Sequence, residues 1–213
     1  MRHYTFIDHL LTGFDAAIRA IVVPENREKK RETPGHDLVD SAISFRDKKH
    51  IAGLMRVNHA GEVCAKALYH GQALTAKLEG VRQKMQIAAD EEIDHLAWCE
   101  ERIMELGSKV SILNIFWYAG SFLLGAAAGL AGDGLSLGFV AETEKQVVKH
   151  LHKHLQQIPK DDFKTRAILS QMEEDEASHA QMAVDAGGIN LPSSIKEIMR
   201  ITSKCLTISS YYI

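Results

Sequence analysis

Residues 92–95 read Glu-Ile-Asp-His, and residues 176–179 read Glu-Ala-Ser-His. In each tetrapeptide a carboxylate and an imidazole are three residues apart, which brings them together on one face of an α-helix, one turn apart. Such a pair can hold one metal ion. A single Glu-x-x-His is common on solvated helix surfaces, so the motif indicates a metal site only because it occurs twice.

Both motifs lie in long segments with helical periodicity. From residue 47 onward, apolar residues recur every three or four positions and proline is almost absent, a pattern that predicts α-helices. The expected long helices cover about residues 48–78, 82–106, 136–157 and 162–186, followed by a shorter helix near 193–207. The apolar stripe of each long helix contains one glutamate where an apolar residue is expected: Glu62, Glu92, Glu144 and Glu176.

The connections between the expected helices predict the fold. Short turns near Gly80 and Pro159 join the first helix to the second and the third to the fourth, whereas about thirty residues separate the second from the third. Two antiparallel hairpins with one long crossover are typical of the ferritin-like four-helix bundle. We therefore expect an all-α chain whose residues 1–213 form one domain. Its parts are an N-terminal helix with a charged loop (1–46), the bundle (47–186) and a C-terminal helix (187–213).

Two segments outside the long helices have unusual compositions. Residues 110–132 contain no Asp, Glu, Lys or Arg and are long enough to span a bilayer. Their four glycines weaken them as an isolated helix, and they must return the chain to the bundle, so we expect an interfacial or buried segment. Pro24 and Pro34 bracket a charged stretch, residues 25–33, that we expect to be a solvated loop.

The four stripe glutamates require a counter-charge. Isolated buried carboxylates are strongly unfavourable, and two ferrous ions would balance four carboxylates and two neutral imidazoles. The glutamates lie 30 and 32 residues apart within the two hairpins, the spacing at which ligands on antiparallel helices meet at mid-height. We expect each Glu-x-x-His pair to hold one iron and the two lone glutamates to bridge them. The predicted ligands are Glu62, Glu92, His95, Glu144, Glu176 and His179.

Several other polar residues lie near these ligands. His59, one turn before the first ligand, is expected to form hydrogen bonds near the centre and not to bind metal. The role of His150 stays open, because it lies slightly under two turns beyond the third glutamate. His152 and His154 are expected to face solvent. The neighbouring acids fall off the stripes and are expected on a solvated face or in contact with the ligands: Glu91, Glu173, Glu174 and Asp175.

Composition argues against other classes of protein. The formal net charge is −3 with acids and bases interspersed, so the chain offers no broad basic face for nucleic acid. Three widely spaced cysteines fit neither a disulfide framework nor a zinc site and favour a reducing compartment. The N-terminal stretch does not have the pattern of an export signal.

Four segments together resemble the demethoxyubiquinone hydroxylase family. They are Val-Asn-His-Ala-Gly-Glu-Val at 57–63, Glu-Glu-Ile-Asp-His-Leu at 91–96, Glu-Thr-Glu at 142–144 and Asp-Glu-Ala-Ser-His at 175–179, and the resemblance extends over roughly residues 40–213. In that family the matching positions are di-iron ligands, which implies the same six residues here. Some members carry a tyrosine directly after the histidine that matches His150, where this chain has Leu151.

The resemblance also implies a function. Members are flavin-free monooxygenases of ubiquinone biosynthesis that hydroxylate a demethoxyubiquinol ring with dioxygen and reducing equivalents, at a membrane surface. We accordingly expect a peripheral protein on the cytoplasmic face of a bacterial inner membrane, as a homo-oligomer or within a ubiquinone-biosynthesis complex, with an electron donor that the sequence leaves open.

Membrane contact requires apolar surfaces, and the terminal helices supply candidates beside the uncharged crossover. The N-terminal stripe consists of Ile7, Leu10, Leu11, Phe14, Ile18 and Ile21. The C-terminal stripe consists of Ile195, Ile198, Met199, Thr202 and Leu206, beside the basic residues Lys196, Arg200 and Lys204. Basic residues beside an apolar stripe suit anionic headgroups. The alternative is that both helices only cap the bundle.

Two other functions remain open at this point. A ferritin-like or rubrerythrin-like iron-handling protein, acting as a ferroxidase or an iron store, would carry the same ligand pattern. A structural bundle without metal is a third interpretation, but it leaves the four stripe carboxylates unexplained.

Overall fold

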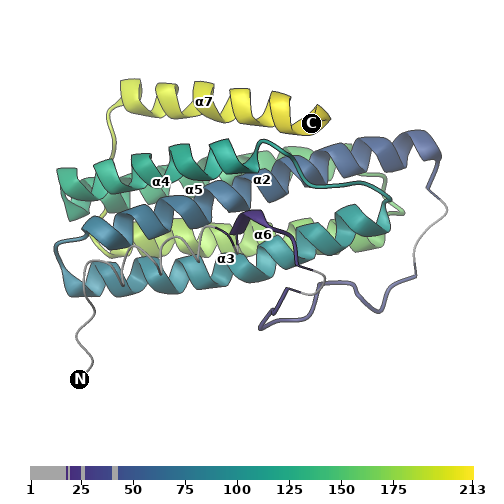
Figure 1. Ribbon diagram of the computed structural model, residues 1–213, viewed down its shortest axis with the longest axis horizontal. Helices are drawn as coiled ribbons and strands as arrows, with labels where there is room; N and C mark the ends of the chain where they lie inside the picture. The colour runs from purple at the N-terminus through teal and green to yellow at the C-terminus, as the bar shows by residue number, and fades with distance from the viewer. Residues whose placement is uncertain (1–17, 19, 25–26, 40–42) are drawn as a thin grey trace.

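The computed structural model describes residues 18, 20–24, 27–39 and 43–213 (Figure 1). No strand occurs among these residues, and the prediction of an all-α chain is confirmed. The helices are α2 (Phe45–Thr75), α3 (Glu79–Glu105), α4 (Asn114–Ala131), α5 (Asp133–Gln157), α6 (Phe163–Asp185) and α7 (Ser193–Tyr212).

Helices α2, α3, α5 and α6 form the predicted bundle of two hairpins, and their ends lie within about three residues of the expected positions. Local chemistry sets these ends. The side chain of Asp162 accepts a hydrogen bond from the amide of Thr165 and caps α6. Gly107 and Gly187 follow α3 and α6 with φ of 72° and 100°, the left-handed conformation that glycine adopts without strain at a helix C-terminus.

The core is divided along the bundle axis. One apolar cluster contains Tyr69 and Met85 together with the start of α5, and a second contains Met55 and Trp98 together with the start of α6. On each bundle helix, the stripe glutamate lies between the residues that belong to one cluster and those that belong to the other. The carboxylates therefore form a polar layer at mid-height, enclosed by apolar side chains above and below, as the spacing predicts.

Most of the uncharged crossover forms the helix α4. This helix packs along α2, and glycines allow the close approach. A Cβ atom on Gly125 would lie 2.2 Å from the carbonyl oxygen of Leu68, and one on Gly71 would lie 2.2 Å from that of Phe122. The glycines that weaken an isolated helix thus create a backbone contact between two helices.

Only one side of α4 is covered. In an 18-residue window of α4 that is long and apolar enough to cross a membrane, 28% of the residues are buried. Burial, one of the two alternatives expected for this segment, is therefore wrong for most of the helix, and an interfacial position stays a prediction. Its exposed apolar side chains include Ile115, Phe116, Leu123 and Leu130.

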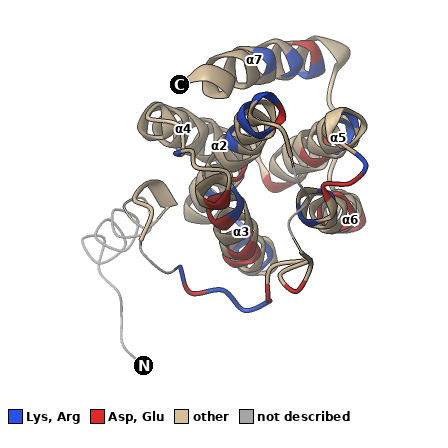
Figure 2. Cartoon of the chain, turned by 90° about the vertical axis from the view of Figure 1, so that its right-hand side faces the viewer, with Lys and Arg blue, Asp and Glu red and all other residues tan. Residues whose placement is uncertain are grey.

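The charged stretch near the N-terminus is a loop, as predicted, but it is only partly solvated. Residues 27–33, which we call the N-terminal strap, pack against α3 (Figure 2), while Glu28, Lys30, Arg31 and Glu32 stay exposed. Arg27 pairs with Glu100 at 2.7 Å, and Lys29 pairs with Glu101 at 2.5 Å. Acids of α3 thus neutralise these two bases, which explains why so charged a segment packs against a helix.

The predicted N-terminal stripe lies mainly outside the described residues. This is the case for Ile7, Leu10, Leu11 and Phe14. Of the residues nearby that are described, Ala20 is fully buried against a small cluster on α2, α3 and α4, and Ile21 packs at its edge. At the other end of the chain, α7 lies across the outside of the bundle (Figure 1).

Candidate metal centre

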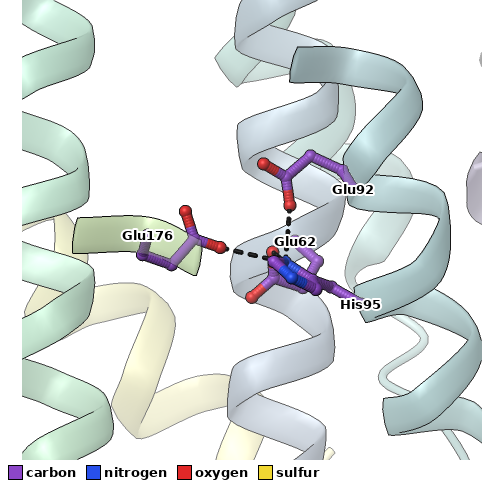
Figure 3. A group of neighbouring side chains, drawn as sticks. All are labelled: Glu62, Glu92, His95 and Glu176. Carbon is purple, nitrogen blue, oxygen red and sulfur yellow. Dashed lines mark hydrogen bonds and ion pairs between the residues drawn. The ribbon is translucent and has the colours of Figure 1, made fainter. Parts of the chain in front are cut away.

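The polar layer at mid-height contains a compact group of potential ligands. Ligand atoms of Glu62 on α2, Glu92 and His95 on α3 and Glu176 on α6 all lie within 4.8 Å of one another (Figure 3). All four side chains are buried. Figure 3 shows the carboxylates of Glu92 and Glu176 directed at the Nδ1 atom of His95, at distances of 3.1 and 3.0 Å.

The other two predicted ligands border this group. The Nδ1 atom of His179 is 3.1 Å from Glu176 Oε2 and 3.6 Å from Glu92 Oε1. Glu144 is fully buried, and one of its oxygens accepts a hydrogen bond from the hydroxyl of Tyr69. The structure therefore brings all six predicted residues to one place. Tyr69 belongs to the stripe of α2, where only its hydroxyl distinguishes it from an ordinary core residue.

The donor set fits a bound cation. Three buried carboxylate oxygens of the proposed ligands, Glu92 Oε1, Glu144 Oε2 and Glu176 Oε1, have no hydrogen-bond partner within the part of the chain that is described. Leaving a charged oxygen unsatisfied in the interior is costly, and bound metal ions would satisfy these oxygens. Carboxylates and imidazoles together are the ligands of non-haem iron sites.

The pKa values show how the site behaves without an ion. Burial raises the pKa of Glu62 and of Glu144 well above the ordinary value, and the neighbouring carboxylates raise both further. Burial alone would lower the pKa of His95 and of His179, but hydrogen bonds to carboxylates outweigh it. The pKa of His95 is raised well above its usual range, and that of His179 is raised to about 10. Without metal, protons supply the positive charge that the ligands require.

A carboxylate outside the cluster holds each imidazole. His95 Nε2 lies 2.9 Å from Asp175 Oδ2, and His179 Nε2 lies 2.7 Å from Glu91 Oε2. Each Nε2 can therefore donate outward, which leaves Nδ1 free to face the carboxylate cluster as a ligand atom. Acids outside the stripes were expected either on a solvated face or in contact with the ligands. Asp175 and Glu91 contact the ligand imidazoles, as the second alternative predicts. Glu174 is exposed instead.

Three further histidines for which the sequence made a prediction lie in different environments. His59 hydrogen-bonds to Glu100 at 3.0 Å and to Asn114 at 3.2 Å, in agreement with a supporting role. His152 is exposed as predicted. His154 is buried, contrary to prediction, because its Nδ1 lies 2.9 Å from Asn58 Oδ1 inside the bundle. Burial lowers the pKa of His154 to about 3, so the ring is neutral.

A cavity of about 410 Å³ adjoins the centre. It lies between α2, α4, α5 and α7, and Glu62 forms part of its wall. His150, whose role the sequence leaves open, also lines the cavity, and its Nε2 atom is buried without a hydrogen-bond partner among the described residues. Most of the remaining wall is apolar and includes Leu68, Leu124, Phe139, Ile198, Met199 and Leu206.

Comparisons with known proteins agree with this centre. The family model described as "Ubiquinone biosynthesis protein COQ7" matches residues 49–210. A 3-demethoxyubiquinol 3-hydroxylase of Legionella pneumophila (strain Corby) is 58% identical over 213 residues, which cover the whole of both chains. A protein of the same name from Acinetobacter baumannii (strain SDF) is 55% identical, again over the whole of both chains. This chain therefore belongs to the COQ7 family of ubiquinone biosynthesis proteins.

Proposed function

We propose that this protein is a 3-demethoxyubiquinol 3-hydroxylase, a di-iron monooxygenase of ubiquinone biosynthesis that uses dioxygen and an external reductant. Full-length relatives carry that enzyme name. The observation that carries the proposal is the position of Glu62, which belongs both to the carboxylate and imidazole cluster and to the wall of the apolar cavity. A ring bound in this cavity would lie against the metal centre. Nothing in the comparisons favours an iron-storage or ferroxidase function.

The six predicted ligands would hold two iron ions, which supply the activation of dioxygen when bound. Glu92 and Glu176 each approach both imidazoles, at distances of 3.0 to 3.6 Å. Either carboxylate could therefore contribute to both metal positions, and the expectation that the lone glutamates bridge stays a prediction. Glu62, 3.6 Å from His95 Nδ1, would contribute to the metal position nearer His95, and Glu144 is the sixth proposed ligand.

The cavity fits an apolar substrate with a small polar head. Its wall is largely aliphatic and aromatic, which favours an isoprenoid chain and excludes water from the centre. The polar groups in its wall include the Glu62 carboxylate, the His150 ring and the side chains of Asn58, Thr143 and Gln146. Burial lowers the pKa of His150 to about 4, so at neutral pH the ring is uncharged and can exchange a hydrogen bond with a quinol hydroxyl.

A membrane surface is the proposed source of this substrate. α4 carries no acidic or basic side chain (Figure 2). It lines the cavity through Trp117, Ser121 and Leu124, and its exposed apolar side chains include Phe116 and Leu123. On α7, Ile201, Ile208 and Tyr212 are exposed near the basic Arg200 and Lys204. This combination suits the interface of an anionic bilayer. We propose that the protein lies at the cytoplasmic face of a bacterial inner membrane. That it forms a homo-oligomer or joins a ubiquinone-biosynthesis complex stays a prediction.

Labelled dioxygen tests the proposed reaction. The diferrous protein, supplied with a demethoxyubiquinol analogue and reductant, should yield a ring-hydroxylated product that carries one atom of the label. The matched control is Glu62→Ala, which removes a proposed ligand at the cavity wall. If the label appears only in water, the protein oxidises iron without transferring oxygen, and the hydroxylase proposal is wrong.

A further inference from the structure

The two imidazoles of the centre have outer partners of unequal quality. Both use Nε2 toward a carboxylate, but Asp175 is mostly buried and Glu91 is half exposed, with 18% and 48% of the side-chain surface accessible. A hydrogen bond screened from water constrains a ring more than one that competes with solvent. The sequence gives no sign of this difference, because Glu91 and Asp175 occupy equivalent positions before the two Glu-x-x-His motifs.

The difference arises from Arg31 of the N-terminal strap. Its Nη1 atom lies 2.8 Å from Asp175 Oδ2, and its Nε atom donates to Asp94 Oδ2 at 3.0 Å. One guanidinium thus links α6 to α3 beside His95, whose Nε2 atom is 3.5 Å from Arg31 Nη2. For Glu91, within the ranges that the structure describes, the only hydrogen-bond or ion-pair partner is His179.

Backbone hydrogen bonds at Lys30 and Arg31 anchor the strap to α3. The amide of Lys30 donates to Asp94 Oδ1 at 2.7 Å, and Trp98 Nε1 donates to the carbonyl oxygen of Arg31 at 3.4 Å. The guanidinium lies over the Trp98 ring, 4.7 Å from its centroid. Trp98 also packs against His95, with 5.2 Å between the ring centroids. Backbone and side chain contacts therefore hold the guanidinium in one orientation.

We propose that Arg31 is a positioning residue that makes the two metal sites unequal. By fixing Asp175, it holds the ring of His95 with Nδ1 directed at the carboxylates. The metal position nearer His95 therefore retains its ion more tightly than the position nearer His179. This inference rests on the di-iron centre of the proposed function. It adds that a segment outside the bundle controls one of the two ions.

Release of iron to a chelator tests the proposal without any substrate. The diferrous protein, mixed anaerobically with excess ferrous chelator, should lose its two irons in a fast and a slow phase. Arg31→Ala should accelerate the slow phase by up to about 10-fold, the lower end of the affinity lost with an outer partner of a ligand, because Asp175 itself remains. The fast phase should keep its rate. Arg31→Lys keeps the positive charge but loses the forked guanidinium group, and it should restore part of the difference between the two release rates.

Two matched variants separate positioning from general destabilisation. Lys29→Ala removes another ion pair of the same strap, with Glu101, and should change neither phase. Glu91→Gln weakens the partner of His179 and should accelerate only the fast phase. Circular dichroism and thermal melting of each variant check that the bundle is intact.

The outcomes distinguish this inference from the function on which it rests. If the unsubstituted protein does not bind two irons, the proposed centre is wrong, and the inference falls with it. If two irons bind but Arg31→Ala leaves both release rates unchanged, or raises both equally, the centre stands and the positioning role of Arg31 is refuted.

Discussion

Metal should stabilise this protein more at pH 8 than at pH 6. Without metal, His179 holds a proton up to a pKa of about 10, whereas an unfolded chain releases it near 6.5. The stability that this proton contributes is fully present below pH 6.5 and is lost as the pH rises toward 10. The raised pKa values of His95, Glu62 and Glu144 act in the same direction. Iron binds only the deprotonated ligands, so its advantage grows as protons become easier to remove.

The size of the effect follows from linkage. A ligand at 100 times its dissociation constant stabilises the folded state by about 2.7 kcal/mol per site. For a chain of this length, 1 kcal/mol corresponds to about 2–4 °C in melting temperature, so each site adds about 5–11 °C. Each displaced proton changes this stabilisation by about 1.4 kcal/mol per pH unit. The proton on His179 alone therefore adds about 3 kcal/mol, or roughly another 6–12 °C, between pH 6 and pH 8.

The assay is thermal melting of the metal-free and metal-loaded protein across this range. Manganese(II) serves as a redox-stable substitute for iron, and an indicator dye in weak buffer counts the protons released on binding. Glu174→Gln is the control, because this exposed side chain lies off the ligand stripes, and it should leave the pH dependence unchanged. A metal-induced shift of equal size at pH 6 and pH 8, with no proton release, would refute the assignment of buried, protonated ligands.

Three further predictions follow from single contacts. Glu62→Ala, Glu144→Ala or His179→Ala should lower the iron content below about two per chain, whereas Glu174→Ala should not; full occupancy in all three would contradict the ligand set. Gly125→Ala should destabilise the folded state by about 1–3 kcal/mol and so lower the melting temperature, because its Cβ would lie 2.2 Å from the Leu68 carbonyl oxygen; an unchanged melting curve would refute close packing of α4. Lys204→Ala should weaken binding to anionic vesicles about fivefold, with Lys84→Ala on α3 as the control; equal binding by both variants would argue against docking through α7.

Helical periodicity predicted the bundle because the spacing of apolar residues in each long helix shows which face of that helix is buried. The stripe residues that the helical period selects on α2 and α3 are all buried: Ile51, Met55, Asn58, Glu62, Ala65 and Tyr69 on α2, and Met85, Ala88, Glu92, His95, Cys99 and Ile103 on α3. The glutamates interrupt these stripes at positions that antiparallel hairpins bring to one level. The sequence therefore contained both the fold and the six residues that meet in the cluster. Whether all six bind iron stays a prediction.

The features that the sequence did not predict depend on contacts between distant segments. Arg31 and Asp175 are far apart in the chain, and nothing local distinguishes a base that binds a distant acid from one that is solvated. The same reason applies to His154, whose partner Asn58 is 96 residues away. The glycines of α4 were expected to weaken an isolated helix, because propensity describes the helix alone, whereas packing against α2 decides the outcome here.

The repeat in the sequence suggests a centre with twofold symmetry, but the surroundings give it two different faces. Both imidazoles come from α3 and α6, where Asp175, Glu91 and the N-terminal strap hold them. The lone glutamates come from α2 and α5, and the cavity lies on that side, with Glu62 in its wall. Imidazoles fixed from behind can keep the metals in place while a carboxylate at the cavity changes position to admit a substrate. The substrate would therefore meet the carboxylate face of the centre, and the strap would act on the opposite face.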